Sequence, residues 1–177
     1  MTTNTETISF FSLALDRQPG LVSRKKTSIR RGMLLGGTPP GWNVLALSQN
    51  DFYQYCDQAA IKLHEITIEC HGVYLVCNGR PYIFISDKLR GAEKTFVCFH
   101  EIGHFWLHKP GDQFSADGKR PSRWANAIEI EADIVAVCAM IPLTVLKRHR
   151  PGEIADLYGY APELVRLRQE VFDCWQI

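Results

Sequence analysis

The chain has 177 residues, of which 46% are hydrophobic and 22% are charged. This is the composition of a globular protein, and the length suits one domain with a sizeable core. The formal net charge of +1 provides no overall field that would attract nucleic acid or acidic substrates. No apolar run approaches the roughly 20 residues that cross a bilayer, and the N-terminus lacks the features of a signal peptide. We therefore expect a cytoplasmic protein with no membrane partner.

Residues 1–45 are predicted to form an N-terminal extension that is partly flexible. They begin with a threonine-rich stretch and end in a Gly/Pro cluster at 36–41, which would interrupt any regular element. Between the two lies a basic run at 24–31, which could contact phosphate but is more often a solvated arm. We expect no direct binding of nucleic acid.

The next segment combines a helix with short strands. Asn50 and Asp51 predict an Asx-type N-cap for a helix that ends near residue 63. Residues 66–68 are all β-branched, which favours a short strand. Two β-rich runs, 72–77 and 81–86, flank Asn-Gly, the dipeptide most typical of a tight hairpin.

Two apolar helices follow the hairpin. Residues 93–108 and 124–140 carry apolar side chains on nearly every side, which is typical of helices buried in a core. A polar loop separates the two helices. The order of helix, hairpin, helix, loop and helix predicts an α+β fold.

The end of the chain is predicted to be a helical C-terminal tail. Residues 152–172 indicate two short helices around a turn at 158–162. We divide the chain into the extension, a central domain at 46–150 and a tail at 151–177.

The first of the two buried helices contains the pattern His-Glu-x-x-His, as His100-Glu-Ile-Gly-His104. On a helix, positions i and i+4 share one face, so both imidazoles can reach one Zn²⁺ ion. Glu101 lies between them and can act as a general base toward water. Burying these groups in an apolar helix costs several kcal/mol unless a metal or another partner satisfies them. We therefore predict a zinc site, with Glu101 as the catalytic residue.

A catalytic zinc needs a third protein ligand, and the second buried helix offers three candidates. Glu129 and Asp133 are four residues apart and share one face, whereas Glu131 is about 200° around the helix from Glu129. We prefer Glu129 as the ligand, with Asp133 holding the other nitrogen of a histidine. Glu131 remains the alternative ligand, or else an exposed charge.

The other histidines are not expected to bind the metal. His108 lies about 12 Å along the helix axis from His100, and we expect it to cap the last carbonyls of the helix. His64, His71 and His149 have no partners at ligand spacing and are expected to be structural or exposed.

The two helices together resemble the ImmA/IrrE family of zinc peptidases. Its pattern His-Glu-x-Gly-His-x-x-x-His is similar to residues 100–108, and its second pattern, Glu-x-Glu-Ala-Asn/Asp, is similar to residues 129–133. The resemblance covers roughly residues 50–145 and continues weakly into the tail. Val135 and the segment 138–141 depart from the family's usual residues, but each change replaces one apolar side chain with another.

The resemblance implies a zincin-like minimal metallopeptidase domain of the gluzincin type. A small antiparallel hairpin or sheet would pack on the two helices, with Zn²⁺ held by His100, His104 and Glu129 and with Glu101 as the catalytic carboxylate. The resemblance also implies a protein substrate, a helix-turn-helix transcriptional repressor cleaved in a stress or mobile-element response. The alternative hypothesis is a non-catalytic, zinc-containing regulatory binding protein.

Overall fold

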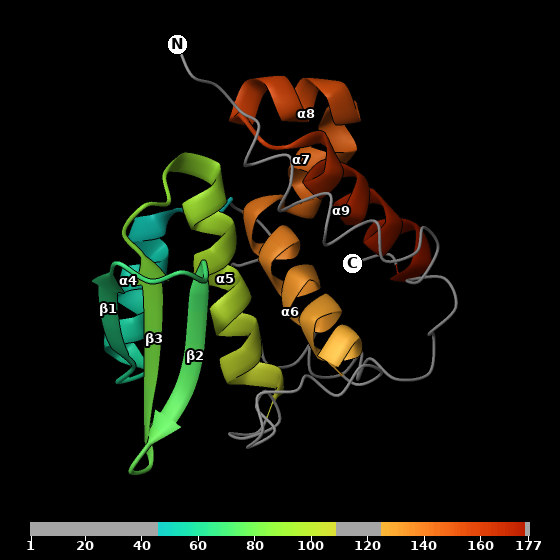
Figure 1. The fold of residues 1–177 in the computed structure, drawn as a ribbon. Coiled ribbons are helices and arrows are strands. Elements are labelled where there is room, and N and C mark those ends of the chain that lie inside the picture. The colour runs from blue at the N-terminus through green and yellow to red at the C-terminus, as the bar shows by residue number, and fades with distance from the viewer. Residues whose placement is uncertain (1–45, 109–124, 176–177) are drawn as a thin grey trace.

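A computed structural model describes residues 46–108 and 125–175, so the predicted extension 1–45 and the loop before the second buried helix lie outside the described residues. The described elements are, in chain order, α4 (Gln49–Gln58), β1 (Lys62–Ile66), β2 (Gly72–Cys77), β3 (Arg80–Ser86), α5 (Gly91–Leu107), α6 (Ala125–Met140), α7 (Leu143–Arg148), α8 (Pro151–Tyr158) and α9 (Pro162–Trp175). The predicted α+β class is confirmed. Figure 1 shows the sheet on one side of α5 and the helices α6 to α9 on the other.

The three strands form one sheet in the order β1-β3-β2. β2 and β3 are the predicted antiparallel hairpin, and both turn residues have positive φ, 50° at Asn78 and 73° at Gly79. β1 pairs with β3 in parallel, so the sheet is mixed rather than wholly antiparallel. This sheet supports the helix that carries the His-Glu-x-x-His motif.

The end of the first helix and the position of the first strand differ from the prediction. α4 ends at Gln58 rather than near residue 63, and β1 covers 62–66 rather than 66–68. Ala60 adopts φ 54°, which stops the helix, and Leu63 pairs with Ile83 across the sheet. Strand pairing therefore overrides the helical spacing of the apolar residues.

The N-cap of α4 is Ser48, two residues before the predicted Asn50. Ser48 and Asp51 form a capping box: the Asp51 carboxylate accepts from the Ser48 backbone N–H at 2.7 Å, while the Ser48 side chain accepts from the Asp51 N–H. These bonds satisfy two backbone donors that a helix start leaves unpaired. They hold α4 where Phe52 packs against Phe99 of α5, with ring centroids 6.1 Å apart.

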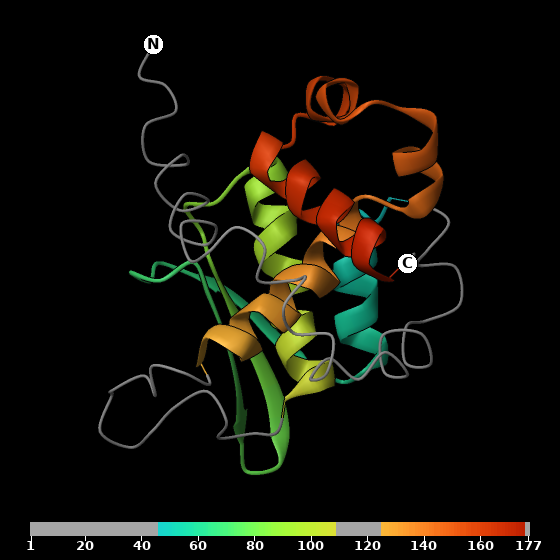
Figure 2. The same ribbon diagram turned by 90° about the vertical axis from the view of Figure 1, so that its right-hand side faces the viewer.

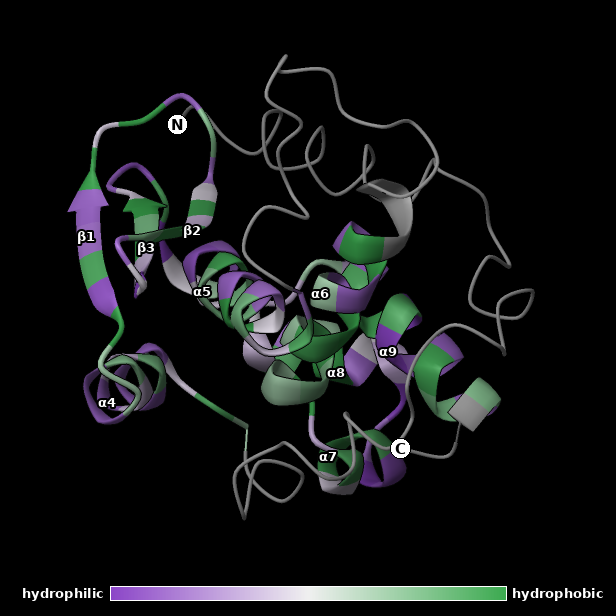
Figure 3. Ribbon diagram, turned by 90° about the horizontal axis from the view of Figure 1, so that it is seen from below, coloured by the Kyte–Doolittle hydropathy of each residue, from purple (hydrophilic) through white to green (hydrophobic). Residues whose placement is uncertain are grey.

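α5 lies between the sheet and α6 at the centre of the core. Ile83 and Ile85 of β3 are fully buried, as are Phe99 and Ile102 of α5. The view from below shows α4 and α5 beside the sheet, and hydrophobic residues concentrate where α5 meets α6 (Figure 3). The prediction of two buried helices is confirmed.

α5 and α6 cross at very short range because Gly103 has no side chain. A Cβ atom placed on Gly103 would lie 2.8 Å from the Cα atom of Ala132, closer than real Cβ contacts. The pair of small residues therefore brings the backbones of the two helices together. It also sets the distance over which side chains of α6 reach the motif on α5.

The C-terminal tail forms two helices, α8 and α9, as predicted, preceded by the short helix α7, which was not predicted. α9 packs on α6 on the side away from the sheet (Figure 2). Arg168 is 2% exposed and donates from Nε to the carbonyl oxygen of Ile141 at 2.7 Å. Over residues 46–108 and 125–175, none of the helices has the length and apolar character needed to cross a membrane.

Candidate metal centre

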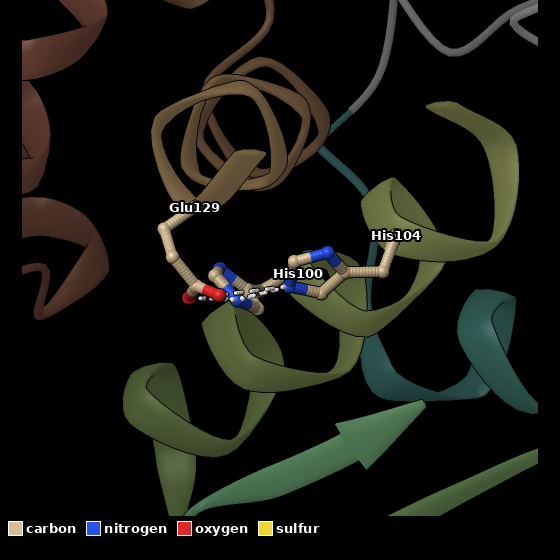
Figure 4. A group of neighbouring side chains, drawn as sticks. All are labelled: His100, His104 and Glu129. Atoms are coloured by element: carbon tan, nitrogen blue, oxygen red, sulfur yellow. Dashed lines mark hydrogen bonds and ion pairs between the residues drawn. The ribbon is translucent and has the colours of Figure 1, made fainter. Parts of the chain in front are cut away.

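His100, His104 and Glu129 meet at one point between α5 and α6. The two histidines lie one turn apart on α5, and Glu129 reaches them from the first half of α6 (Figure 4). One donor atom from each side chain can be chosen so that all three lie within 4.8 Å of one another. His104 is buried, whereas His100 and Glu129 are partly exposed. The cluster therefore combines two imidazoles and one carboxylate beside solvent.

The spacing of the donor atoms fits a zinc ion. The Nε2 atoms of His100 and His104 are 2.9 Å apart, and the Glu129 carboxylate oxygens lie 3.4 Å from His100 Nε2 and 3.8 Å from His104 Nε2. Ligands about 2.0–2.1 Å from a tetrahedral zinc are about 3.3 Å from each other. The three observed separations bracket this value. Three protein ligands of this kind leave a fourth position open for water or substrate.

Asp133 lies behind His100. Its carboxylate oxygen Oδ1 is 2.8 Å from Nδ1 of His100, so it accepts a hydrogen bond from the nitrogen that faces away from the cluster. This bond fixes the orientation of the ring and leaves Nε2 free to bind a cation. Asp133 and Glu129 both contact His100 and so lie on the same side of α6, while the role of Asp133 at a metal site stays a prediction.

Glu131 and His108 form a pair beside this cluster. Glu131 lies 3.1 Å from Nε2 of His108, and Nδ1 of His108 lies 2.9 Å from Nδ1 of His104. Among the described residues, Glu131 does not belong to the group of three that could hold a metal. The expectation that the His108 side chain caps carbonyls is wrong, because its ring contacts His104 and Glu131 while its backbone N–H bonds to the carbonyl of His104. Glu131 is also half-buried rather than an exposed charge.

The acidic residues favour positive charge at the cluster. Burial lowers the pKa of His100, but the hydrogen bonds that its ring donates to the carboxylates of Asp133 and Glu129 outweigh this effect and raise the pKa to about 10. Burial and the neighbouring charge of His100 lower the pKa of His104 to about 3. The His104 imidazole is therefore neutral, as a metal ligand must be, while the neighbouring carboxylates attract a cation.

Glu101 lies next to the cluster and is buried against β2. Its side chain is 4% exposed, and burial raises its pKa to about 7, against the opposing effects of His100 and of the Tyr74 backbone N–H that bonds to it. A Cβ atom on Gly72 would lie 2.6 Å from Oε1 of Glu101. The same Cβ atom would lie 2.7 Å from Cγ1 of Val97, so a side chain at position 72 would require the carboxylate or Val97 to move.

The remaining histidines and the cysteines lie in ordinary structural environments. The ring of His64 stacks on Phe84, while His71 and His149 lie 3.9 Å from Glu93 and Glu153. All six cysteines are free. The sequence missed one part of the site, the contact from Glu131 through His108 to His104. The position of His108, four residues after His104, was the sequence signal that could have indicated this contact.

Comparison with known proteins gives two matches. A family model described as the IrrE N-terminal-like domain, a peptidase family, matches residues 54–168. A curated relative, "Uncharacterized immunity region protein 2" of Bacillus phage phi105, is 33% identical over 105 residues. The matched region covers 56% of this chain and 66% of that protein, slightly under two thirds of its length.

Proposed function

Because the chain belongs to the IrrE N-terminal-like peptidase family, we propose that it is a zinc-dependent endopeptidase. In this proposal His100, His104 and Glu129 hold the ion. The observation that carries the proposal is the set of donor separations, 2.9, 3.4 and 3.8 Å, with the Glu101 carboxylate adjacent. A structural zinc would normally have four protein ligands and would not need a neighbouring general base.

In the proposed reaction, Glu101 transfers the proton. A zinc ion bound at this cluster would supply a Lewis acid that activates water and polarises the scissile carbonyl. Glu101 accepts a proton from the attacking water, whose oxygen bonds to the carbonyl carbon. As the C–N bond breaks, Glu101 returns that proton to the leaving amine. The buried position of Glu101 suits both steps, because a raised pKa lets one carboxyl group act first as base and then as acid.

The proposed substrate is a helix-turn-helix transcriptional repressor, cleaved in a stress or mobile-element response. Two observations support this choice: the resemblance of the motif helices to the ImmA/IrrE peptidases, and the relative named as an immunity region protein of a phage. A repressor is a cytoplasmic substrate, so the proposal also places this protein in the cytoplasm. Direct binding of nucleic acid is not part of the proposal.

The metal part of the proposal is tested by zinc content. Purified protein is expected to carry about one zinc per chain, and His104→Ala is expected to lose it because one of three ligands is removed. His64→Ala is the matched control, since His64 is exposed and stacks on Phe84 away from the cluster. Equal zinc content in the wild type and in His104→Ala would contradict the assignment.

The catalytic part is tested with Glu101→Gln, which keeps the size of the side chain but cannot accept the proton. Zinc content should be retained, while cleavage should fall by about 10²–10⁴-fold. The assay co-expresses each variant with the helix-turn-helix repressors encoded beside the gene and follows the shortened product on a gel. Equal cleavage by both forms would refute the role of Glu101. If the wild type binds a repressor and leaves it intact, the chain is a binding protein instead.

A further inference from the structure

Each of the two proposed histidine ligands has its second ring nitrogen occupied. Nδ1 of His100 contacts the carboxylate of Asp133 directly, at 2.8 Å. Nδ1 of His104 contacts no carboxylate but the ring of His108, at 2.9 Å, and His108 in turn contacts Glu131 at 3.1 Å. Figure 4 shows the ring of His104 with one nitrogen toward Glu129 and the other turned away from it. Both histidines thus have a carboxylate behind the second ring nitrogen. His100 contacts Asp133 directly, whereas His104 is connected to Glu131 through the ring of His108.

Metal binding fixes the hydrogen positions along this chain of contacts. A zinc ion needs the lone pair of His104 Nε2, so the ring proton of His104 must be on Nδ1. That N–H donates to Nδ1 of His108, which must therefore carry no proton. The proton of His108 is then on Nε2, from which it donates to the carboxylate of Glu131. Every donor in the series has one acceptor, and the series ends on a negative charge.

We propose that His108 and Glu131 are positioning residues that orient His104 for zinc and increase its affinity for the ion. The inference rests on the proposed function, since it takes His104 as a ligand. It also gives Glu131 a role different from the alternative left open by the sequence, because Glu131 would act through His108 rather than bind the metal. An acidic partner on a ligand's second nitrogen makes the ligand more basic and holds its ring in one orientation.

Water cannot easily replace the contact between His108 and Glu131, because both side chains are largely buried. The side chain of His108 is 4% exposed and that of Glu131 is 20% exposed. If either partner is removed, a buried nitrogen is left without its bond. The cap role of position 108 does not require the ring, because the backbone N–H alone bonds to the carbonyl of His104. The histidine side chain is therefore available for the contact with His104.

The first test measures the zinc dissociation constant of the full chain by competition with a chelator. Glu131→Gln and His108→Ala are each expected to weaken zinc binding by about 10–100-fold. In the His108→Ala background, adding Glu131→Gln should change the constant by less than about twofold, because Glu131 acts only through His108. The matched control is the pair His149→Ala and Glu153→Gln, a His–Glu contact of 3.9 Å away from the cluster, which should leave zinc affinity unchanged.

The second test observes the tautomers directly, by ¹⁵N–¹H spectroscopy of the histidine rings in the zinc-loaded chain. We expect His104 to be protonated on Nδ1 and His108 on Nε2, a result that a purely structural role would not require. Thermal unfolding with chelator present checks that the variants fold. If His108→Ala does not fold, Glu131→Gln still carries the test, since it preserves the shape of a partly exposed side chain.

Three outcomes would overturn the inference. Zinc constants within twofold of wild type for both single variants would exclude any positioning role. An equal loss from Glu131→Gln with and without His108 would show that Glu131 acts on the ion independently. Protonation of His108 on Nδ1 would contradict the order of donors. In each case, loss of zinc by His104→Ala would leave the proposed function standing, whereas a wild type that binds no zinc would remove both.

Discussion

Gly103→Ala should weaken zinc binding although it adds only one methyl group and touches no ligand. The added Cβ would lie 2.8 Å from the Cα atom of Ala132, whereas ordinary contacts begin at 3.4 Å. α5 and α6 must therefore separate by about 0.6 Å, the difference between these two distances. The atom in the way belongs to backbone, so no side-chain rotation can relieve the contact.

The separation affects stability and metal binding to different degrees. Overpacking costs about 1–3 kcal/mol, and the better helix propensity of alanine over glycine returns about 1 kcal/mol. We expect a net loss of up to about 2 kcal/mol in the free energy of unfolding. Glu129 moves with α6 while His100 and His104 stay on α5, and zinc sites tolerate about 0.2 Å in ligand distance. Zinc affinity should therefore fall at least about 10-fold.

The assay combines urea unfolding in the presence of chelator with a zinc competition titration. Chelator removes the contribution of bound metal to stability, so that the two quantities are measured separately. The control is Gly152→Ala in α8, where an added Cβ meets nothing within 4 Å and should stabilise by about 0.4–1 kcal/mol. If Gly103→Ala is stabilised like the control and keeps its zinc affinity, the close crossing of the two helices does not set the geometry of the cluster.

Two further substitutions distinguish effects on Glu101, the proposed catalytic residue, from effects on the stability of the fold. Gly72→Ala places a Cβ 2.6 Å from Oε1 of Glu101, so cleavage should fall by roughly 10²-fold while zinc content stays at the wild-type level. Loss of zinc along with activity would mean that β2 supports the ligands and not only Glu101. Ser48→Ala removes the capping box of α4 and should cost about 1 kcal/mol in urea unfolding, with zinc affinity unchanged. A stability equal to wild type would show that the capping box contributes nothing.

Sequence could predict the elements whose signals are local. Asn78 and Gly79 fix a tight turn by their own backbone preferences, and the hairpin follows from them. The spacing of His100 and His104 puts both on one face of any helix. The sequence placed β1 too late in the chain, because the position of this strand depends on its pairing with β3. Leu63 has helical spacing with Ala59, yet its partner Ile83 is 20 residues further along the chain.

The contact between His108 and Glu131 could not be predicted by considering each helix alone. A helical wheel extended to position 108 assumes that α5 continues, but the helix ends at Leu107 and His108 adopts φ −120° and ψ 142°. The ring then contacts His104 instead of projecting further along the axis. A wheel for α6 places Glu131 on a different side from Glu129, as the structure has it, but does not show which neighbour lies there. Only the packing of two helices provides that information.

The crossing at Gly103 explains how three acidic residues at alternate positions of α6 all reach histidines. Ala132 faces α5 at the crossing, so Glu131 and Asp133 project about 100° to either side of it, toward His108 and His100. Glu129, one turn earlier, contacts both His100 and His104. Three carboxylates therefore lie against a row of three imidazoles. A divalent cation at the cluster would offset the negative charge of these carboxylates, so the packing that supports the histidines also favours binding of a metal.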